Sequence, residues 1–183
     1  MKRLLILMMF VIIGGVANAQ YKYINQISLD NVKISVNMSL PNSVGGRKCE
    51  TKVINCSKKT VKYIYIKRLV VNDFCEYEPC EIDGEWILSS KIVGPINGNP
   101  ELSSKTKIPY RYIHSYSSTE LHYNSAANKS IIGYCEIIFT DGSTVEYINK
   151  NFIDVQLMKY KESMGEYYDE ETCKNVILKI LID

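Results

Sequence analysis

The stretch TVKYIYIKRLVV (residues 60–71) decides the fold, because it is the longest internal run of β-branched and aromatic residues in the chain. Apolar or aromatic side chains occupy both of its faces when it is extended. They are Tyr63, Tyr65 and Leu69 on one face and Ile64, Ile66 and Val70 on the other. Such a pattern is typical of a central strand that is covered from both sides. The stretch therefore predicts a β-sandwich with this strand at its centre.

Shorter strand patterns flank this stretch. Residues 31–39 (NVKISVNMS) alternate apolar and polar side chains, and in residues 48–55 Cys49, Thr51 and Val53 share one side. Further strands are expected at residues 86–93, 108–116, 120–123, 130–140 and 144–157. Between the last two, Asp141-Gly142 is the strongest short hairpin signal of the chain. This spacing predicts an all-β antiparallel sandwich of about seven strands.

The end of the chain has a different pattern. DEETCKNVILKILID (residues 169–183) opens with acidic residues and carries Lys179 near its end, which suits the dipole of a helix. On this helix Cys173, Val176 or Ile177, and Ile180 would share one face. The β-branched content also permits a final strand. We expect one sandwich domain at residues 20–160, and a short C-terminal tail at residues 161–183 that is helical after a polar connector (161–168).

The chain opens with MKRLLILMMFVIIGGVANAQ, which has the three parts of a secretory signal peptide. Two basic residues precede an apolar segment (residues 4–13), and Ala17-Asn18-Ala19 provides a small-x-small cleavage site. A membrane anchor is the alternative, but the apolar segment is too short to span a bilayer. We predict a signal peptide at residues 1–19, in the compact style of bacteria. The mature chain is then expected in the periplasm, at the cell surface or outside the cell, without a membrane span.

The charge balance argues against nucleic acid as a partner. The chain has 22 basic and 20 acidic residues, and loss of Lys2 and Arg3 leaves 22 − 2 = 20 of each. A protein that binds nucleic acid neutralises phosphates with a basic field. The mature chain has no such excess of positive charge.

All six cysteines lie in the mature part, and an even number in an exported chain predicts disulfides. Cys75 and Cys80 bracket four residues that end in Pro79, which suits the loop of a hairpin closed by a Cys75–Cys80 bond. Zinc is the alternative for these two thiols. The other four cysteines are scattered singly, and no histidine lies at ligand spacing from them, so we expect no metal or other cofactor.

Several turns resemble those of a known group of proteins. PNSVGG, INCSKKTVKYIYI, VGPI, HYNSAANKS and IIFTDGSTVEY follow one another in this order. They resemble small secreted bacterial immunoglobulin-like or fibronectin-III-like β-sandwich proteins of unknown function, which carry NNSGKTIKYI, GPI, WYNS and a closing DGT hairpin. The resemblance covers residues 32–147 and implies a fold, with no activity or binding residues to transfer. The chain departs from it at His122, where the pattern has an aromatic residue, and in its extra cysteines.

The resemblance also implies an order of strands and with it a second disulfide. Cys49 would lie early in strand B and Cys135 early in strand F, which run in the same direction in facing sheets of an immunoglobulin-like domain. Both side chains would point inward at one level, as a Cys49–Cys135 bond requires. A Cys56–Cys173 bond then follows by elimination and would attach the tail.

The best candidate for a binding surface is a row of aromatic residues. Tyr110, Tyr112, His114 and Tyr116 would share one face of the expected strand at residues 108–116, with Arg111 opposite. Arg111 or His114 would supply polar contacts to a ligand. Tyrosines on a sheet can stack on sugar rings or contact a protein partner through apolar area and a polar tip. The alternative is that tyrosine is simply a favoured strand residue whose hydroxyl reaches the sheet rim.

Catalytic patterns are sparse. The sequence contains no GxSxG, HExxH, phosphate-binding or dinucleotide-binding motif. We expect a secreted, non-catalytic binding or structural module that recognises a glycan or another exported protein, whereas its oligomeric state is left open. The alternative is a small secreted enzyme or enzyme inhibitor that acts through loops near His114, Glu120 and His122.

Overall fold

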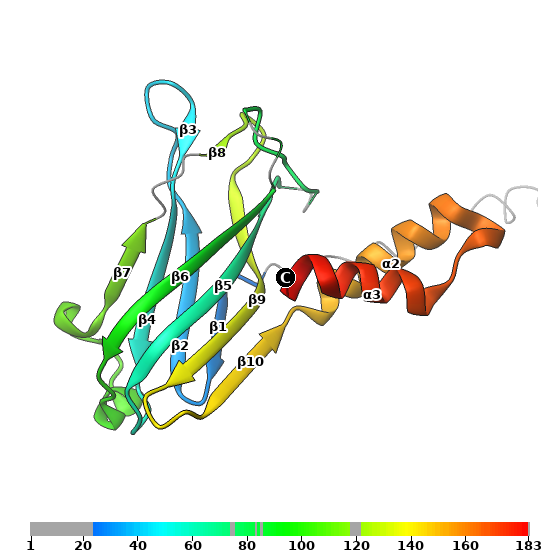
Figure 1. Ribbon diagram of the computed structural model, residues 1–183. Coiled ribbons are helices and arrows are strands. Elements are labelled where there is room, and N and C mark those ends of the chain that lie inside the picture. Colours follow the sequence, from blue (N-terminus) through cyan, green and yellow to red (C-terminus); the bar gives the residue numbers. More distant parts are fainter. Residues whose placement is uncertain (1–23, 74–75, 83, 85, 118–121, 183) are drawn as a thin grey trace, which may run out of the picture.

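The computed structural model describes residues 24–73, 76–82, 84, 86–117 and 122–182. Antiparallel strands in these residues form two four-stranded sheets. The first sheet has the order β1 (Gln26–Leu29), β2 (Val32–Met38), β4 (Cys49–Asn55) and β7 (His114–Ser117). The second has the order β10 (Thr144–Ile148), β9 (Lys129–Phe139), β5 (Val61–Val71) and β6 (Ile87–Ile96). Two short strands, β3 (Gly46–Arg47) and β8 (His122–Tyr123), pair with each other (Figure 1).

The two sheets share one apolar core. Inward residues of the first sheet, among them Ile34 and Val53, pack with Ile64, Ile66 and Ile137 of the second. Alternation in β4 places Cys49, Thr51 and Val53 on the buried side, as the sequence predicts. At the predicted hairpin between β9 and β10, Gly142 has a φ of 83°, a conformation that glycine adopts without strain. A sandwich-like all-β body is therefore confirmed.

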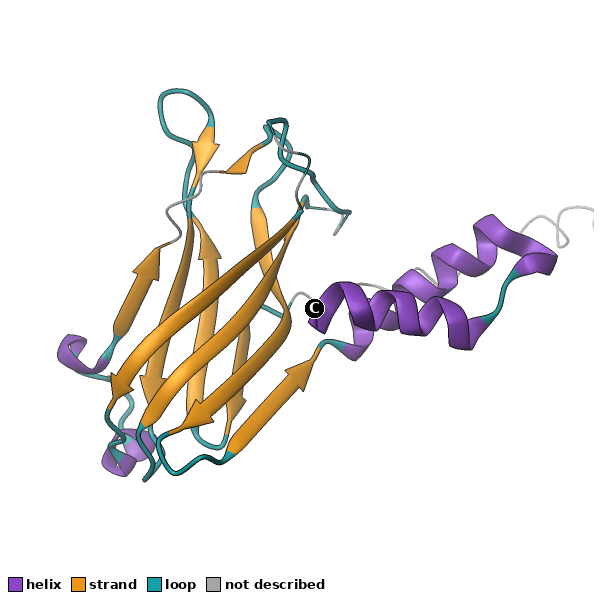
Figure 2. Cartoon of the chain, in the orientation of Figure 1, coloured by secondary structure: helices purple, strands orange, loops and turns teal. Residues whose placement is uncertain are grey.

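The outward face of β5 is only half covered, which corrects the expectation for residues 60–71. Leu69 and Val71 lie in an apolar cluster with residues of two helices, whereas Tyr63 and Tyr65 remain half-exposed. The covering helices are α2 (Lys150–Met164) and α3 (Glu170–Ile182), joined by the short 3-10 turn η3 (Gly165–Tyr167). They form a hairpin that projects from the sandwich (Figure 2). The start of α2 and the end of α3 pack against the second sheet.

The tail differs from the sequence prediction in its extent. A helix at the end of the chain is confirmed as α3, whose buried face is Cys173, Ile177 and Leu181 rather than one that includes Ile180. The return strand predicted for residues 144–157 ends at Ile148, and α2 occupies most of the remainder and half of the expected connector. The helical part thus begins at residue 150, inside the range that the sequence assigned to the sandwich.

Asn149 is the reason why the strand stops there. Its side-chain oxygen accepts the N–H of Phe152 at 3.1 Å and so caps the N-terminus of α2. Its Nδ2 donates to the carbonyl of Ile132 at 2.9 Å, and its backbone N–H donates to the carbonyl of Gly133 at the same distance. The helix start is thereby attached to β9. Gly133 leaves room for Leu181 of α3, because a Cβ here would lie 3.0 Å from Leu181 Cδ2.

A charged side chain bridges the two sheets. Arg68 of β5 is 1% exposed, and its Nη1 donates to the carbonyl of Cys49 at 3.1 Å and to Thr51 Oγ1 at 3.3 Å on β4. Its Nη2 donates to Ser90 Oγ on β6. Hydrogen bonds of a charged donor are stronger than neutral ones, so this side chain adds polar links to an otherwise apolar interior.

The described cysteines do not form the two predicted disulfides that lie among them. Cys49, Cys56, Cys80, Cys135 and Cys173 are all buried thiols in this structure, and Cys75 lies outside the described residues. Neither Cys49–Cys135 nor Cys56–Cys173 is formed. Cys49 packs in a small cluster with Val70 and Leu88, apart from the main core that holds Cys135, so the two do not share the level that the resemblance implied. Burial raises the pKa of Cys135 to about 12.

Candidate functional site

The predicted row of aromatic residues is divided between two elements. Residues 108–113 are not a strand, because Tyr110–Tyr112 form the 3-10 turn η2, which follows another such turn, η1 (Pro100–Ser104). Tyr110 is 82% exposed, and the guanidinium of Arg111 lies 4.9 Å from the ring centre of Tyr112. A turn of this kind does not place its side chains in line with those of the following strand.

The other two members of the row belong to β7. His114 and Tyr116 are half-buried, while Ser115 and Ser117 between and beside them are exposed. Tyr116 packs against the core of the sandwich, and this burial raises the pKa of its hydroxyl. The five predicted residues therefore do not form one continuous exposed surface.

The two histidines of the alternative prediction also lie apart. His114 is opposite Val53 on β4, whereas His122 is 1% exposed on β8 and opposite Arg47. The six residue steps from Arg47 to Val53 span roughly 20 Å in an extended chain. Glu120 lies outside the described residues. Within the described part of the chain, no group of three or more His, Cys, Asp or Glu side chains is arranged to hold a metal ion.

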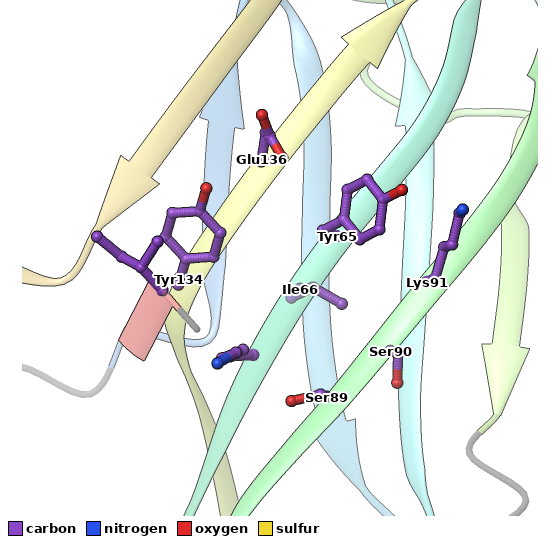
Figure 3. A pocket seen from close by; sticks show the side chains of 9 residues that line it. Tyr65, Ile66, Ser89, Ser90, Lys91, Tyr134 and Glu136 are labelled. Carbon is purple, nitrogen blue, oxygen red and sulfur yellow. The ribbon is translucent and has the colours of Figure 1, made fainter. Parts of the chain in front are cut away.

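One hollow lies on the outer face of the second sheet, where the helical cover stops. Its volume is about 570 Å³, within the range of small-molecule sites. Figure 3 shows side chains of three adjacent strands around it. They are Tyr65, Ile66 and Lys67 of β5, Ser89, Ser90 and Lys91 of β6, and Tyr134 and Glu136 of β9, with Ile182 of α3 at the border.

The alternation of β5 and the end of α3 together create this hollow. Ile64 and Ile66 are buried between the sheets, so Tyr63 and Tyr65 are directed outward. The ammonium of Lys67 donates to the carbonyl of Ile180 at 3.3 Å, where a positive charge is favourable at the end of a helix. The helix thus ends beside the hollow and leaves its floor open.

A cation lies over two aromatic rings at one side of the hollow. Lys91 Nζ is 4.4 Å from the ring centre of Tyr63 and 5.1 Å from that of Tyr65. Lys62 Nζ also lies over Tyr63, at 5.3 Å. A hydrogen bond with Tyr65 raises the pKa of Lys91 further above neutrality, so its ammonium is charged there. We call Tyr63, Tyr65 and Lys91 the tyrosine–lysine platform.

The opposite side of the hollow has a different polarity. Tyr134 is almost buried, and burial together with the carboxylates of Glu136 and Glu146 raises the pKa of its hydroxyl. This phenol stays neutral and can act as a donor, while Glu136 supplies an acceptor. The hollow therefore combines aromatic rings with a charged donor, hydroxyl donors and one carboxylate. This set can bind a polar ligand that has an apolar face.

The sequence contains a pattern that indicates this site, although the tyrosines of residues 60–71 were interpreted as covered core residues. Tyr63 and Tyr65 alternate with Ile64 and Ile66, and polar Lys62 and Lys67 flank them. A fully covered strand would bury these lysines. The flanking charges indicate that one face of this half of the strand meets solvent.

No helix in the described part of the chain combines the length and the apolar character that a membrane span requires. Comparisons with protein-family models, curated proteins and solved structures gave no match to the chain.

Proposed function

We propose that the protein is an exported, non-catalytic binding module of a bacterial periplasm or cell surface. Its ligand binds in the hollow on the outer face of the second sheet, against the tyrosine–lysine platform. The observation that carries the proposal is the position of Lys91 over Tyr63 and Tyr65 beside an open hollow. Export rests on the N-terminal sequence, and the absence of a known catalytic motif supports a binding role.

We further propose an immunoglobulin-like or fibronectin-III-like type for the sandwich. The order β2-β4-β7 in one sheet, facing β10-β9-β5-β6 in the other, corresponds to strands A-B-E opposite G-F-C-C′ of that topology. β1 is then an addition to the edge of the first sheet. Folds of this kind host many functions, so the argument for binding rests on the site itself.

A glycan is the ligand that suits this site best. Sugar rings present an apolar face that can stack on a tyrosine, and hydroxyl groups that pair with donors and acceptors at its rim. Tyr65 offers the ring, Lys91 and Tyr134 offer donors, and Glu136 accepts. An exported protein is the other ligand class, since a tyrosine anchor beside a charged group is common at protein interfaces.

A glycan array and a pull-down of exported proteins, both made with the mature protein, test the proposal. The variant Tyr63→Ala/Tyr65→Ala should bind its ligand roughly tenfold more weakly or not at all, since two stacking surfaces are lost. Tyr110→Ala is the control, because it removes another surface tyrosine, which lies on η2 and does not line the hollow. Equal binding by all three proteins would refute the site. Hydrolysis of an arrayed glycan would refute the non-catalytic role.

A further inference from the structure

Strand β6 is an exceptionally long open edge. It is the last strand of its sheet and has ten residues, whereas the other outermost strands, β1, β7 and β10, have four, four and five (Figure 1). An open edge presents unpaired backbone N–H and C=O groups, and proteins usually keep such edges short or cover them. A long edge that is not covered needs a partner.

The register shows which backbone groups point away from the sheet. Val70 N–H donates to the carbonyl of Trp86 at 3.0 Å, and Leu69 is opposite Ile87. Backbone N–H and C=O groups alternate in direction along an antiparallel strand. Those of residues 86, 88, 90 and 92 therefore point toward β5, and those of residues 87, 89, 91 and 93 point away from the sheet. Among the described residues, none forms a backbone hydrogen bond with these outward groups.

The sequence of this edge is symmetric about Ser90. In ILSSKIV (residues 87–93), Ile87 corresponds to Val93, Leu88 to Ile92 and Ser89 to Lys91. If two copies of the strand pair antiparallel about Ser90, each residue faces its counterpart in the other copy. Opposite residues of an antiparallel pair point to the same side of the sheet. Buried Leu88 would then meet Ile92, and outward Ile87 would meet Val93.

We propose that β6 pairs with β6 of a second copy of this chain about a two-fold axis at Ser90. The pairing joins the two second sheets into one continuous sheet of eight strands. Ser89 of each copy exchanges two hydrogen bonds with Lys91 of the other copy, and Ile87 of each copy does the same with Val93 of the other. Ser90 lies opposite Ser90 of the second copy, in a residue pair that exchanges no hydrogen bonds. A two-fold axis can pass between two such residues. Pro95, which has no N–H to donate, limits the pairing to residues 87–93.

Two side chains support this partner. Val93 is 61% exposed in the single chain, and the pairing would cover it with Ile87 of the second copy. A lysine on an edge strand usually opposes such pairing. Here the ammonium of Lys91 lies over Tyr63 and Tyr65 of the neighbouring strand, and so is drawn away from the edge and from the second copy.

The pairing also extends the surface described above. Three strand intervals, roughly 14 Å, separate the β5 strands of the two copies, and the two-fold axis places both tyrosine–lysine platforms on the same face. Two sites on one face can bind two units of a repeating ligand, and the linked sites then bind more tightly than either alone. The self-pairing itself stands independently of what the platform binds.

Sedimentation or light scattering of the mature protein over a range of concentrations tests the pairing. We expect a reversible dimer, and Val93→Lys should weaken it roughly tenfold or more, because both symmetric Ile87–Val93 contacts are lost. Val176→Lys is the matched control, since Val176 is also an exposed valine but lies on α3. A monomer at every concentration, or a dimer that survives Val93→Lys, would overturn the proposal. A dimer lost only in Val176→Lys would place the interface on the helices and overturn it as well.

Amide hydrogen exchange of the unmodified protein gives a second test that needs no variant. As the dimer forms, the amides of residues 87, 89, 91 and 93 should slow, while those of residues 88, 90 and 92 should change little, because they already face β5. This alternation identifies the edge itself as the interface. Dimerisation without it would contradict the proposed register.

Discussion

Replacing Asn149 by alanine should uncouple the helical hairpin from the sheet. Asn149 is buried, and its side chain makes two hydrogen bonds that alanine cannot make. Loss of the N-cap of α2 costs about 1 kcal/mol. Loss of the donor to the buried carbonyl of Ile132 costs a further 1–3 kcal/mol or so, because that oxygen is left without this partner. We expect the free energy of unfolding to fall by about 2–4 kcal/mol in Asn149→Ala.

Urea unfolding followed by circular dichroism and by tryptophan fluorescence measures this change. Trp86 is the single tryptophan of the chain, and its ring centre lies 6.3 Å from that of Phe152 on α2. Its emission therefore reports on the contact between the hairpin and the sheet. A fluorescence transition at a lower urea concentration than the circular-dichroism transition would show that the hairpin is released first.

Asn99→Ala provides the control, because Asn99 caps η1 through its side-chain oxygen, which accepts the N–H of Glu101 at 3.2 Å. This variant loses a cap without the bond to a buried carbonyl, and about 1 kcal/mol or less is expected. If Asn149→Ala destabilises the protein no more than Asn99→Ala, the bond to Ile132 does not have the role that we assign to it.

Three further outcomes are expected. Gly133→Ala should lower the free energy of unfolding by about 1–3 kcal/mol, measured by urea unfolding, because the new methyl group would press on Leu181 of α3. Cys135, with a pKa of about 12, should resist a thiol reagent at pH 8 in the folded protein and react at once in denaturant; rapid labelling of the folded protein would show that β9 opens. Hydrogen bonds from Ser143 lower the pKa of Asp141, so the β9–β10 turn should keep its stability above about pH 4 and lose it as the pH falls through the lowered pKa. A pH titration of Asp141 by NMR checks this, and a pKa at or above the usual value would contradict it.

Local sequence patterns were enough to predict those parts of the fold that depend on residues close together in the chain. The alternation of Cys49, Thr51 and Val53 and the Asp141-Gly142 turn specify a strand and a hairpin without knowledge of the rest of the chain. These features follow from backbone geometry and from burial on one side.

Helix α2 was missed because its residues fit two patterns. Its β-branched residues favour a strand, and they follow directly on the alternating residues of β10. However, Phe152, Gln156 and Tyr160 recur at helical spacing after Asn149, a residue that favours the N-cap. What decides between the two is the apolar patch on the second sheet, which exists only once the sheet has formed.

The candidate site could not be located for a similar reason. Tyr63 and Leu69 occupy the same face of β5, and the sequence gives them the same environment. The hairpin covers Leu69 and stops before Tyr63, so the difference arises from where α3 ends. The prediction at Tyr110 and Tyr112 was wrong about the strand, because Pro109 precedes a short 3-10 turn.

The position of Leu181 has a consequence for the order in which the protein forms. This residue is fully buried, although it lies near the end of the sequence, and it packs on Leu69 and Ile131 in the middle of the chain. During synthesis, the sheet can assemble before residue 181 emerges, and its apolar patch then faces water. A chaperone that holds incompletely folded chains would find a binding surface there until α3 has formed. Chains that end before residue 181 would keep this apolar patch exposed, and exposed apolar surface leads to aggregation or degradation.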